Sequence, residues 1–492
     1  MTKADLHVHS CYSKHPSEWF LQRIGTMESY TPVEEVYSMA RQRGMSFVTL
    51  TDHNTIEGAL ELRKQHPEDT FISSEVTAYF PESGCKVHIL VYDITPEQFE
   101  RIQAARENIY ELRDLLKNED ICCSVAHATF SVNSKLTVDH LEKLILLFDI
   151  FEGINGTRGR LCNQEWVDIL QNLTPGMLAR LVEKHGIKPW SADSWIKGFT
   201  GGSDDHAGLF IGRTFTMAEE KTVKGMIQRI KSKRSLAGGR HGDHKSLAFI
   251  IYKIAYEFSK DKSAANDTLW HTVNTLLFEE SRLGLRNWLA VRRMKRLKGS
   301  QEELLGRFFS DVVENRPKDL LEDHDSVCRL YESLATLADD FFTMVVSSLE
   351  KDLSNGDAGR LLKNFSAMLP AIFMAAPFFS AVRIQHANRH LGKDLSESLG
   401  IVSGNGDKRI LWFSDTVVEL NGVAVTMREL AKTAHRLNRP MKLVTSLQPD
   451  EENIQLPPNT VNLPCIYSLT PDFYSAVTLR VPSLLRSLDI IE

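Results

Sequence analysis

Over residues 1–221, short apolar segments alternate with longer segments whose apolar positions recur every three or four residues. The first pattern is typical of buried strands, and the second of helices that lay one face on a sheet. Strands are predicted at residues 3–8, 46–51, 71–77, 86–92, 121–126, 150–154 and 200–203. Helices are predicted at residues 32–43, with Thr31 as N-cap, 56–65, 97–117 and 137–147. Repeated β–α units of this kind predict an α/β fold with a largely parallel sheet or barrel.

The pattern changes after this segment. Residues 222–405 show helical periodicity and few strand signals, so an all-helical region is predicted there. Its helices are expected at residues 223–233, 245–259, 268–297, 301–313, 326–351 and from 359 onward. Residues 406–492 return to alternation, with a strand at 409–414, a helix at 425–437 and a strand at 441–446. The 492 residues are therefore expected to form three domains, 1–221, 222–405 and 406–492.

Composition narrows the class of protein. The formal net charge of −6 argues against a nucleic-acid-binding surface over the whole molecule, although a local basic groove remains compatible with it. The seven cysteines are scattered, odd in number and without a Cys-x-x-Cys pair, which indicates reduced thiols. The apolar run at 368–382 is too short for a membrane span and contains two prolines, so a buried helix pair is expected. With the first motif so near Met1, no signal peptide is expected and a cytoplasmic location is predicted.

Candidate metal ligands gather at the predicted strand ends. His7 and His9 stand two residues apart on a strand and therefore project from the same face. Other candidate ligands stand on or just after the later strands: His53, Glu75, His88, His127, Asp204 and His206. Each alone is more often a hydrogen-bonded core or surface residue, but in such folds strand ends meet on one rim. Imidazoles with carboxylates suit zinc, manganese or iron, and this many ligands indicates two or three divalent ions.

The same blocks resemble a known family. The blocks that carry the resemblance are Asp5-Leu6-His7-Val8-His9-Ser10, Thr51-Asp52-His53-Asn54, Glu75, His88, Ala126-His127 and Gly202-Ser203-Asp204-Asp205-His206. In order, they are similar to the signature of the PHP (polymerase and histidinol phosphatase) family of metal-dependent phosphoesterases. The stretches 151–156 and 212–214 also resemble the later strands of that family. The resemblance implies a distorted seven-stranded (β/α) barrel with a trinuclear metal site.

The resemblance also implies a division of the ligands. One ion would be held by His7, His9, Glu75 and Asp204. Glu75 would bridge to a second ion that His88 and His127 complete, and His53 and His206 would bind a third. The commonest family pattern has a Ser-Asp pair after the first block, whereas this chain has Ser13-Lys14 followed by His15. A subset of the family uses His there, so His15 is assigned to the third ion; without it, the centre would be dinuclear.

Asp5 and Asp52 are predicted to support the ligands, because a metal-bound imidazole usually donates its other N–H to a carboxylate. The alternative for both is loop or helix capping. Asp205, between two predicted ligands, is expected to face the opposite side.

Clustered divalent ions point to hydrolysis of a phosphate ester by a metal-activated hydroxide. The first segment contains no Gly-x-Ser-x-Gly elbow and no P-loop, so neither a serine nucleophile nor nucleotide-powered transfer is expected. Arg158 and Arg160 are candidates for holding the phosphate, and Arg213 is a weaker one. The alternative for the first two is a basic surface turn.

The expected substrate is a small phosphomonoester, nucleotide or sugar phosphate. A phosphodiesterase or exonuclease acting on nucleic-acid ends is an alternative that needs a local basic groove, and the acidic composition does not favour it. A metal-stabilised scaffold without catalysis is a second alternative. The long connection 156–199 carries Trp166, Trp190 and Trp195, which are expected to anchor the core or else to stack a base.

The last segment resembles a different family. Residues 409–415 and 420–424, followed by a helix, are similar to the start of retaining (family 4-like) glycosyltransferases with two Rossmann domains. The resemblance implies a partial Rossmann-like α/β unit whose glycine-containing loop approaches a donor phosphate. The donor-nucleotide domain has no counterpart in the chain. This segment is therefore expected to be a remnant used for packing or the front part of a longer bifunctional protein.

Overall fold

A computed structural model describes residues 1–15, 22, 25–262, 304, 324–355, 369–401, 410–419, 421–448, 455–470 and 478–491. The chain divides into two compact units, one of residues 1–266 with 380–403 and one of residues 267–379 with 404–492. The predicted helices at 268–297 and 301–313 lie outside the described residues, apart from residue 304. The three-domain division drawn from the sequence stays a prediction.

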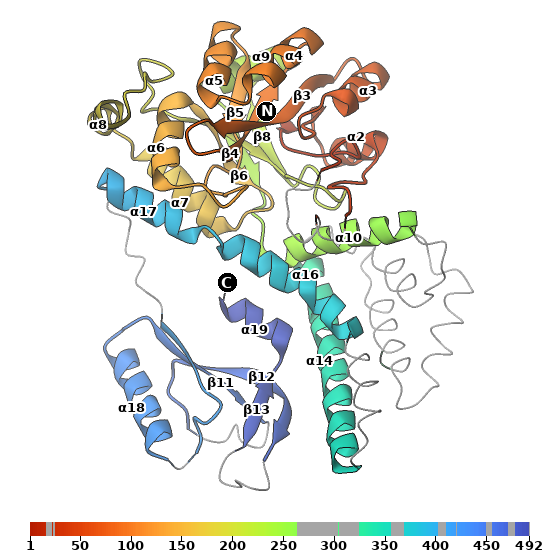
Figure 1. Cartoon of the computed structure of the whole chain (residues 1–492), viewed down its shortest axis with the longest axis vertical. Coiled ribbons are helices and arrows are strands. Elements are labelled where there is room, and N and C mark those ends of the chain that lie inside the picture. The colour runs from red at the N-terminus through yellow and green to blue at the C-terminus, as the bar shows by residue number, and fades with distance from the viewer. Residues whose placement is uncertain are drawn as a thin grey trace. The chain divides into compact units, whose positions relative to one another are not determined.

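A nine-stranded sheet forms the centre of the first unit (Figure 1). The strands follow the order β7-β6-β5-β4-β3-β2-β1-β8-β9. Its strands are β1 (Thr2–Asp5), β2 (Phe47–Leu50), β3 (Thr70–Phe80), β4 (Cys85–Tyr92), β5 (Cys122–Val125), β6 (Ile150–Asn155), β7 (Gly198–Gly202), β8 (Thr214–Ala218) and β9 (Leu236–Gly239). Parallel pairs are β1–β2, β2–β3, β5–β6 and β6–β7; antiparallel pairs are β3–β4, β4–β5, β1–β8 and β8–β9. The α/β class is confirmed, but the pairing is mixed rather than largely parallel.

The sheet curls until its far strands nearly meet. The Thr216 hydroxyl of β8 accepts a hydrogen bond from the Gly201 N–H of β7 (2.8 Å) and lies 3.0 Å from the Gly201 carbonyl. Ser235, before β9, donates to the Phe199 carbonyl of β7 (2.8 Å). The result is barrel-like, with two strands more than the seven expected. The missed strands are short, and β9 reads Leu-Ala-Gly-Gly, which has little intrinsic strand preference.

Helices surround this sheet, some of them packed on other helices. They are α2 (Val33–Gln42), α3 (Glu57–Gln65), α4 (Pro96–Ala105), α5 (Ile109–Asn118), α6 (Val138–Leu147), α7 (Arg160–Gln171), α8 (Pro175–His185), α9 (Val223–Lys231), α10 (His244–Lys262) and α17 (Arg389–Leu399). The single helix expected at 97–117 is two helices, because Asn108 caps α5 by accepting from the Tyr110 N–H (3.0 Å). The 156–199 connection contains α7 and α8. Pro32, not Thr31, stands at the N-cap of α2, without a side-chain cap.

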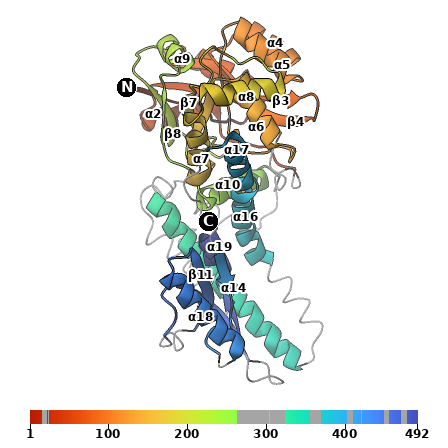
Figure 2. The same ribbon diagram turned by 90° about the vertical axis from the view of Figure 1, so that its left-hand side faces the viewer.

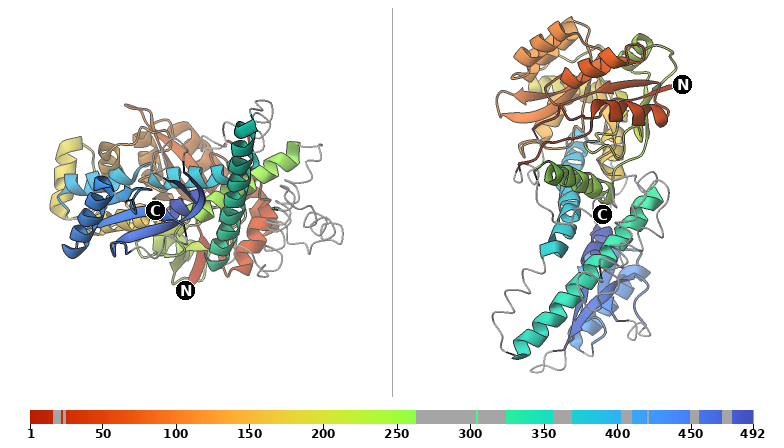
Figure 3. Two further views of the ribbon diagram at one scale, coloured as in Figure 1. Left: turned by 90° about the horizontal axis from the view of Figure 1, so that it is seen from below. Right: turned by 90° about the vertical axis from the view of Figure 1, so that its right-hand side faces the viewer.

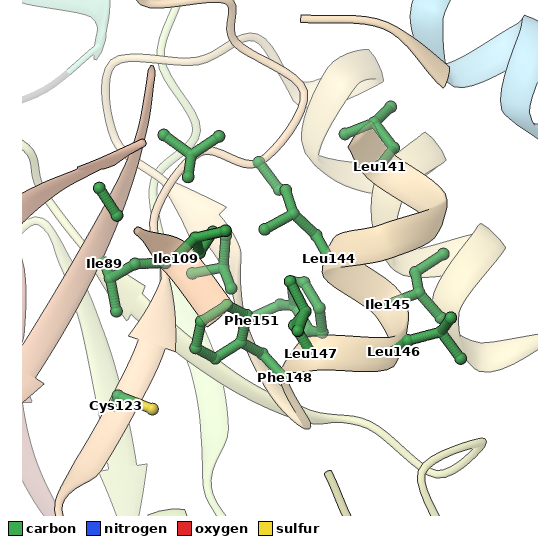
Figure 4. Packing of buried hydrophobic residues seen from close by; sticks show 14 of the residues in the cluster. Ile89, Ile109, Cys123, Leu141, Leu144, Ile145, Leu146, Leu147, Phe148 and Phe151 are labelled. Carbon is green, nitrogen blue, oxygen red and sulfur yellow. The ribbon is translucent and has the colours of Figure 1, made fainter. Parts of the chain in front are cut away.

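The largest core lies between the sheet and α6 (Figure 4). Leu141, Leu144 and Ile145 of α6 are fully buried there, next to Phe148 at the end of α6 and Phe151 of β6 (Figure 4). The α17 helix, which the sequence grouped with the helical region, packs beside α7 and α6 (Figure 2). Its Leu391, Leu395 and Leu399 join the same cluster. This part of the predicted helical region therefore belongs to the first unit.

A four-stranded sheet forms the second unit, in the order β10-β11-β12-β13. Its strands are β10 (Ile410–Phe413), β11 (Met441–Leu447), β12 (Thr460–Leu469) and β13 (Leu479–Pro482), and its helices are α14 (His324–Asn355), α18 (Gly422–Arg436) and α19 (Leu484–Ile491). The first three strands pair in parallel and β13 pairs antiparallel. The predicted strand–helix–strand is confirmed, with Asn421 capping α18, and Figure 3 shows α14 alongside the sheet. The resemblance to a glycosyltransferase stays a prediction.

The 368–382 run forms most of one helix, α16 (Leu369–His386), rather than a helix pair, with Pro377 inside it. Among the helices of the described residues, none combines the length and apolarity that crossing a membrane requires. All seven cysteines carry free thiols, as the sequence indicates.

Candidate metal centre

Glu75 of β3 lies at the centre of the histidine cluster and is fully buried. Its Oε2 lies 3.1 Å from Nε2 of His7, 3.2 Å from Nε2 of His9 and 3.1 Å from Nδ1 of His53. Its Oε1 lies 2.7 Å from Nδ1 of His88 and 3.2 Å from Nε2 of His127. One carboxylate therefore faces imidazoles that β1, β2, β4 and β5 position on or just after the strand. A carboxylate surrounded in this way is a candidate metal ligand.

Asp204, just after β7, closes the other side of the cluster. Its Oδ1 lies 3.2 Å from Nε2 of His7, 3.6 Å from Nε2 of His9 and 3.7 Å from Nδ1 of His206. Its Oδ2 accepts hydrogen bonds from Asn155 (3.0 Å) and Thr157 (2.9 Å), which fix the carboxylate. Asp204 has a φ of 51° and His127 a φ of 26°, so both depart from the usual backbone of L-residues. Such conformations are often found at functional sites.

A glycine brings the Asp204 loop close to β1. A Cβ built on Gly202 would lie 2.3 Å from the His7 Cβ, which no real side chain could tolerate. The Asp204 N–H donates to the His7 carbonyl (2.6 Å), and the His9 N–H donates to the Asp205 carbonyl (3.1 Å). The close approach of β7 therefore lets Asp204 and His206 reach the two histidines of the first block.

Fixed hydrogen bonds orient three of the rings. Glu152 Oε1 accepts from Nδ1 of His7 (3.0 Å), the Ser13 oxygen accepts from Nδ1 of His9 (3.0 Å), and the Asp204 carbonyl lies 3.0 Å from Nδ1 of His206. With the proton on Nδ1, each Nε2 carries the lone pair that a metal ligand needs. All three Nε2 atoms are buried and make no hydrogen bond. The donor set therefore fits metal ions.

Four groups of candidate ligand atoms lie mutually within 4.8 Å in this cluster: His7–His9–Glu75, His7–His127–Asp204, His53–Glu75–His88 and His9–His53–His206. They contain all the predicted ligands except His15. Another such group, Asp139–Glu142–His185, lies apart from the sheet rim on α6 and α8. There the Lys184 ammonium lies 2.5 Å from a Glu142 carboxylate oxygen, so an ion pair already balances the charge of that carboxylate.

The electrostatics keep the carboxylates charged. Burial alone would raise the pKa values of Glu75 and Asp204, but the neighbouring imidazoles hold both well below their ordinary range. Burial lowers the pKa of His88, and it lowers that of His206 to about 4, so both rings are neutral at neutral pH. For His53 the opposing charges of Glu28 and Glu75 outweigh burial and raise the pKa to about 10. Burial would lower the pKa values of His7 and His9 as well, but the neighbouring carboxylates raise both, so the cluster favours positive charge, which a bound cation would supply.

Asp5 and Asp52 were expected to accept a hydrogen bond from the imidazole of a metal ligand. Neither contacts a ring nitrogen of the described histidines. Asp5 instead accepts backbone hydrogen bonds from Ser203 (2.8 Å) and Gly212 (2.7 Å) and so ties the Asp204 loop to β1. Asp52 accepts from the Ser13 hydroxyl (2.9 Å), whose oxygen also bonds His9, so Asp52 acts through Ser13. Asp205 faces away from the cluster, where backbone N–H groups surround its carboxylate.

Sequence reasoning gave no role to Glu152, which bonds both His7 and the His127 N–H (2.8 Å). The signal for it was a glutamate inside the apolar strand β6. Glu28 was also missed. It is 3% exposed, and its Oε2 lies 3.1 Å from Nε2 of His53. No periodic pattern marks Glu28, which comes from an irregular segment. His15, by contrast, is exposed and lies outside the groups of close ligand atoms.

Two hollows adjoin the cluster. The larger has a volume of about 760 Å³, and His53 and His88 are among the residues that line it. Its walls include Tyr12, Lys14, His15, Tyr79, Lys86 and Arg106. The smaller is lined by the metal-site residues on one side and by Leu247, Ile250, Ile251 and Ile254 of α10 on the other. The α10 helix thus gives the centre an apolar wall.

Of the predicted phosphate-binding residues, the structure brings Arg158 to the cluster. It lines the smaller hollow, and its guanidinium lies 3.6 Å from the centre of the Phe130 ring. Its Nε and Nη1 are buried and make no hydrogen bond with the described residues. Arg160 is exposed at the start of α7, and neither Arg160 nor Arg213 is among the described residues that line these two hollows.

The tryptophans anchor the core, which was the favoured expectation. Trp166 packs edge-on against Phe151 with ring centres 5.5 Å apart, and Trp190 stacks on Phe148 at 5.9 Å. Trp195 packs against the same core cluster. None of the three lines a hollow beside the cluster, so base stacking there has no support among the described residues.

Comparison with known proteins adds little to this geometry. No family model matches the chain. An uncharacterized protein of Methanocaldococcus jannaschii is 35% identical over 77 residues, which are 15% of this chain and 43% of that protein. The chain thus spans under half of that relative. A solved structure of a proposed metal-dependent phosphoesterase from Bifidobacterium adolescentis covers 47% of this chain and 96% of its own, at 16% identity and a TM-score of 0.27. Similarity this low carries no argument.

Proposed function

We propose that the first unit is a metal-dependent phosphoesterase that hydrolyses a small phosphate ester. The observation that carries the proposal is Glu75, a buried carboxylate with five imidazole nitrogens at 2.7–3.2 Å. The ligand inventory suits two or three ions of zinc, manganese or iron.

Each ligand has a stated place in the proposal. One ion is assigned to His7, His9, Glu75 and Asp204, and a second to Glu75, His88 and His127. His53 and His206 are assigned to a third. Bound divalent ions supply an activated water at neutral pH and neutralise phosphoryl oxygens during in-line attack.

The protein's own groups orient the ligands and hold the phosphate. Glu152, Ser13 and the Asp204 carbonyl fix the His7, His9 and His206 rings by their Nδ1 atoms. Arg158 lines the smaller hollow with buried guanidinium donors, and its guanidinium lies over the Phe130 ring. Because a guanidinium binds two phosphoryl oxygens at once, Arg158 is suited to hold the ester in line with the ions. Leu247, Ile250, Ile251 and Ile254 of α10 add apolar side chains to the lining of the smaller hollow.

The hollow above the cluster supports a small-molecule substrate. Its volume of about 760 Å³ lies in the usual range for small-ligand pockets, about 300–1,000 Å³. Lys14, Lys86 and Arg106 place positive charge on its walls, which suits an anionic ester such as a nucleotide or sugar phosphate.

The test is turnover of p-nitrophenyl phosphate and bis(p-nitrophenyl) phosphate after reconstitution with zinc, manganese or iron, together with elemental analysis. We expect two or three ions per chain and activity on at least one ester. His9→Ala should lose metal and activity together. His185→Ala is the matched control, because His185 is also buried against a carboxylate but lies outside the cluster.

Three results would redirect the proposal. Faster turnover of the diester and of single-stranded oligonucleotides would favour the nuclease alternative. Bound metal that raises the melting temperature without any turnover would favour a scaffold. Absence of metal from the reconstituted wild type would refute the proposal.

A further inference from the structure

We infer that Gln385 is a positioning residue that holds the turn carrying Arg158 and so keeps the Arg158 guanidinium beside the metal centre. The inference rests on the proposed function and concerns how the same site holds phosphate. Gln385 lies near the C-terminal end of α16, in the region that the sequence predicts to be all-helical. Residues 380–403 belong to the first unit, so this side chain acts inside the unit that contains the metal centre.

The side-chain amide of Gln385 binds the backbone on both sides of Arg158. Its Nε2 donates to the Thr157 carbonyl (2.6 Å), and its Oε1 accepts from the Gly159 N–H (2.8 Å). The side chain is 5% exposed, so both of its polar atoms need partners. These partners fix the orientation of the amide, because the reversed amide would place oxygen against the Thr157 carbonyl and nitrogen against the Gly159 N–H. A glutamine is therefore matched, in its donor and in its acceptor, to the peptide groups that flank Arg158.

The same turn is tied to the metal cluster. The Thr157 hydroxyl donates to Oδ2 of Asp204 (2.9 Å), a proposed ligand. The Arg158 carbonyl accepts from the Gly242 N–H (2.8 Å), which holds the turn to the segment before α10. Gln385 lies 228 residues after Thr157, so the turn acquires these last contacts only once the end of α16 has packed against it.

The position of the Arg158 side chain depends on this backbone. Its Nε and Nη1 are buried and make no hydrogen bond with the described residues. Its guanidinium lies 3.6 Å from the centre of the Phe130 ring, which packs edge-on against His127 with ring centres 5.7 Å apart. The guanidinium is therefore placed by a ring contact and by the backbone that carries it. Because a displacement of about 1 Å in a group that positions a substrate can cost about 100-fold in rate, contacts that fix this backbone bear on phosphate binding.

The end of α16 also contributes to the smaller hollow. Ile384, next to Gln385 in the chain, lines this hollow together with Arg158. An alternative role for Gln385 is to join α16 to the rest of the unit as a purely structural contact. The two roles differ in what a substitution changes: loss of a structural contact lowers stability alone, whereas loss of a positioning residue lowers phosphate affinity through Arg158.

The experiment measures the affinity of the manganese-loaded full chain for inorganic phosphate by isothermal titration calorimetry. Gln385→Met keeps the length of the side chain but removes both hydrogen bonds, and we expect it to weaken phosphate binding about 10-fold. Arg158→Ala should weaken it about 10–100-fold. Bound manganese, counted by elemental analysis, should be unchanged in both variants. Ser398→Ala is the matched control: it removes a hydrogen bond from the same segment to Glu142 (2.6 Å), away from the metal centre, and should leave phosphate affinity unchanged.

A double mutant separates positioning from a general loss of structure. Gln385→Met in the Arg158→Ala background should weaken phosphate binding no further, because both changes act on the same guanidinium. Gln385→Asn keeps the amide on a side chain one methylene shorter, so its phosphate affinity should lie between those of the wild type and Gln385→Met. This milder variant tests the inference even if Gln385→Met does not fold.

Three results would overturn the inference: wild-type phosphate affinity in Gln385→Met or Gln385→Asn, additive losses in the double mutant, or loss of manganese from the Gln385 variants. Each of them leaves the proposed function standing when the wild type still hydrolyses an ester. A wild type without metal would refute both.

Discussion

The central position of Glu75 makes Glu75→Gln the sharpest test of the metal centre. The amide keeps the size of the side chain but removes its charge and turns one acceptor into a donor. In the proposed arrangement Glu75 serves two ions, so the substitution should weaken both. The quantity to compare is the stability gained on adding metal, because the metal-free stabilities of the two proteins will themselves differ.

The expected magnitude follows from linkage. Metal at 1,000 times its dissociation constant stabilises a protein by about 4 kcal/mol per site. Substituting even a partner of a ligand typically weakens metal binding about 10–100-fold, or roughly 1.4–2.7 kcal/mol, and Glu75 is proposed as a ligand itself. Over two ions, the gain on adding metal should therefore fall by roughly 3–5 kcal/mol. For a unit of this size that is a difference of roughly 10 °C in melting temperature.

The assay is urea or thermal unfolding of the full chain with and without saturating manganese, followed by circular dichroism. Glu142→Gln is the matched control: this carboxylate is equally buried and also contacts a histidine, His185 at 2.7 Å, but lies outside the cluster. It should lower stability without changing the gain on adding metal. Equal gains in the wild type and Glu75→Gln would refute the bridging role and, with it, the reasoning from the Glu75 distances.

Three further predictions concern single residues. Arg158→Ala should lower kcat/KM about 10–100-fold, because a charged hydrogen-bond pair contributes about 1.5–3 kcal/mol, whereas exposed Arg160→Ala should leave steady-state kinetics unchanged. Gly202→Ala should destabilise the first unit by about 3 kcal/mol or more in urea unfolding, because its Cβ would lie 2.3 Å from the His7 Cβ, while Gly176→Ala, with open space around it, should be nearly neutral. Burial lowers the pKa of Lys197 from 10.5 to about 8, so the folded state releases this proton before the unfolded state and stability should rise with pH between those values. Relative to Lys197→Met, the wild type should gain about 3 kcal/mol over that window, and a flat difference between the two pH profiles would contradict the assignment.

The first seven strands of the barrel could be predicted from the sequence because their buried faces require apolar residues in short continuous or alternating runs. The seven segments predicted between residues 3 and 203 all overlap observed strands. The pattern failed where local preference and tertiary position disagree. Strand β9 reads Leu-Ala-Gly-Gly, and its pairing with β8 requires a glycine at 239, where a Cβ would lie 2.2 Å from the Arg213 carbonyl oxygen. Such a strand forms because the neighbouring strand approaches so closely that only glycine fits, and strand propensities do not include this contact.

The same distinction explains which site residues could be foreseen. His7, His53 and Asp204 sit at strand ends, so strand prediction alone brings them to one rim. Glu28 does not lie at the end of a strand. Its position depends on hydrogen bonds from the Glu28 and Ser29 N–H groups to the Ser13 carbonyl, which join two irregular segments. The family resemblance pointed to His15 because it compares positions along the chain, whereas a metal ion selects atoms by distance and charge. Contacts between irregular segments, such as the one that places Glu28 beside His53, are therefore the part of the site that a pattern along the chain does not predict.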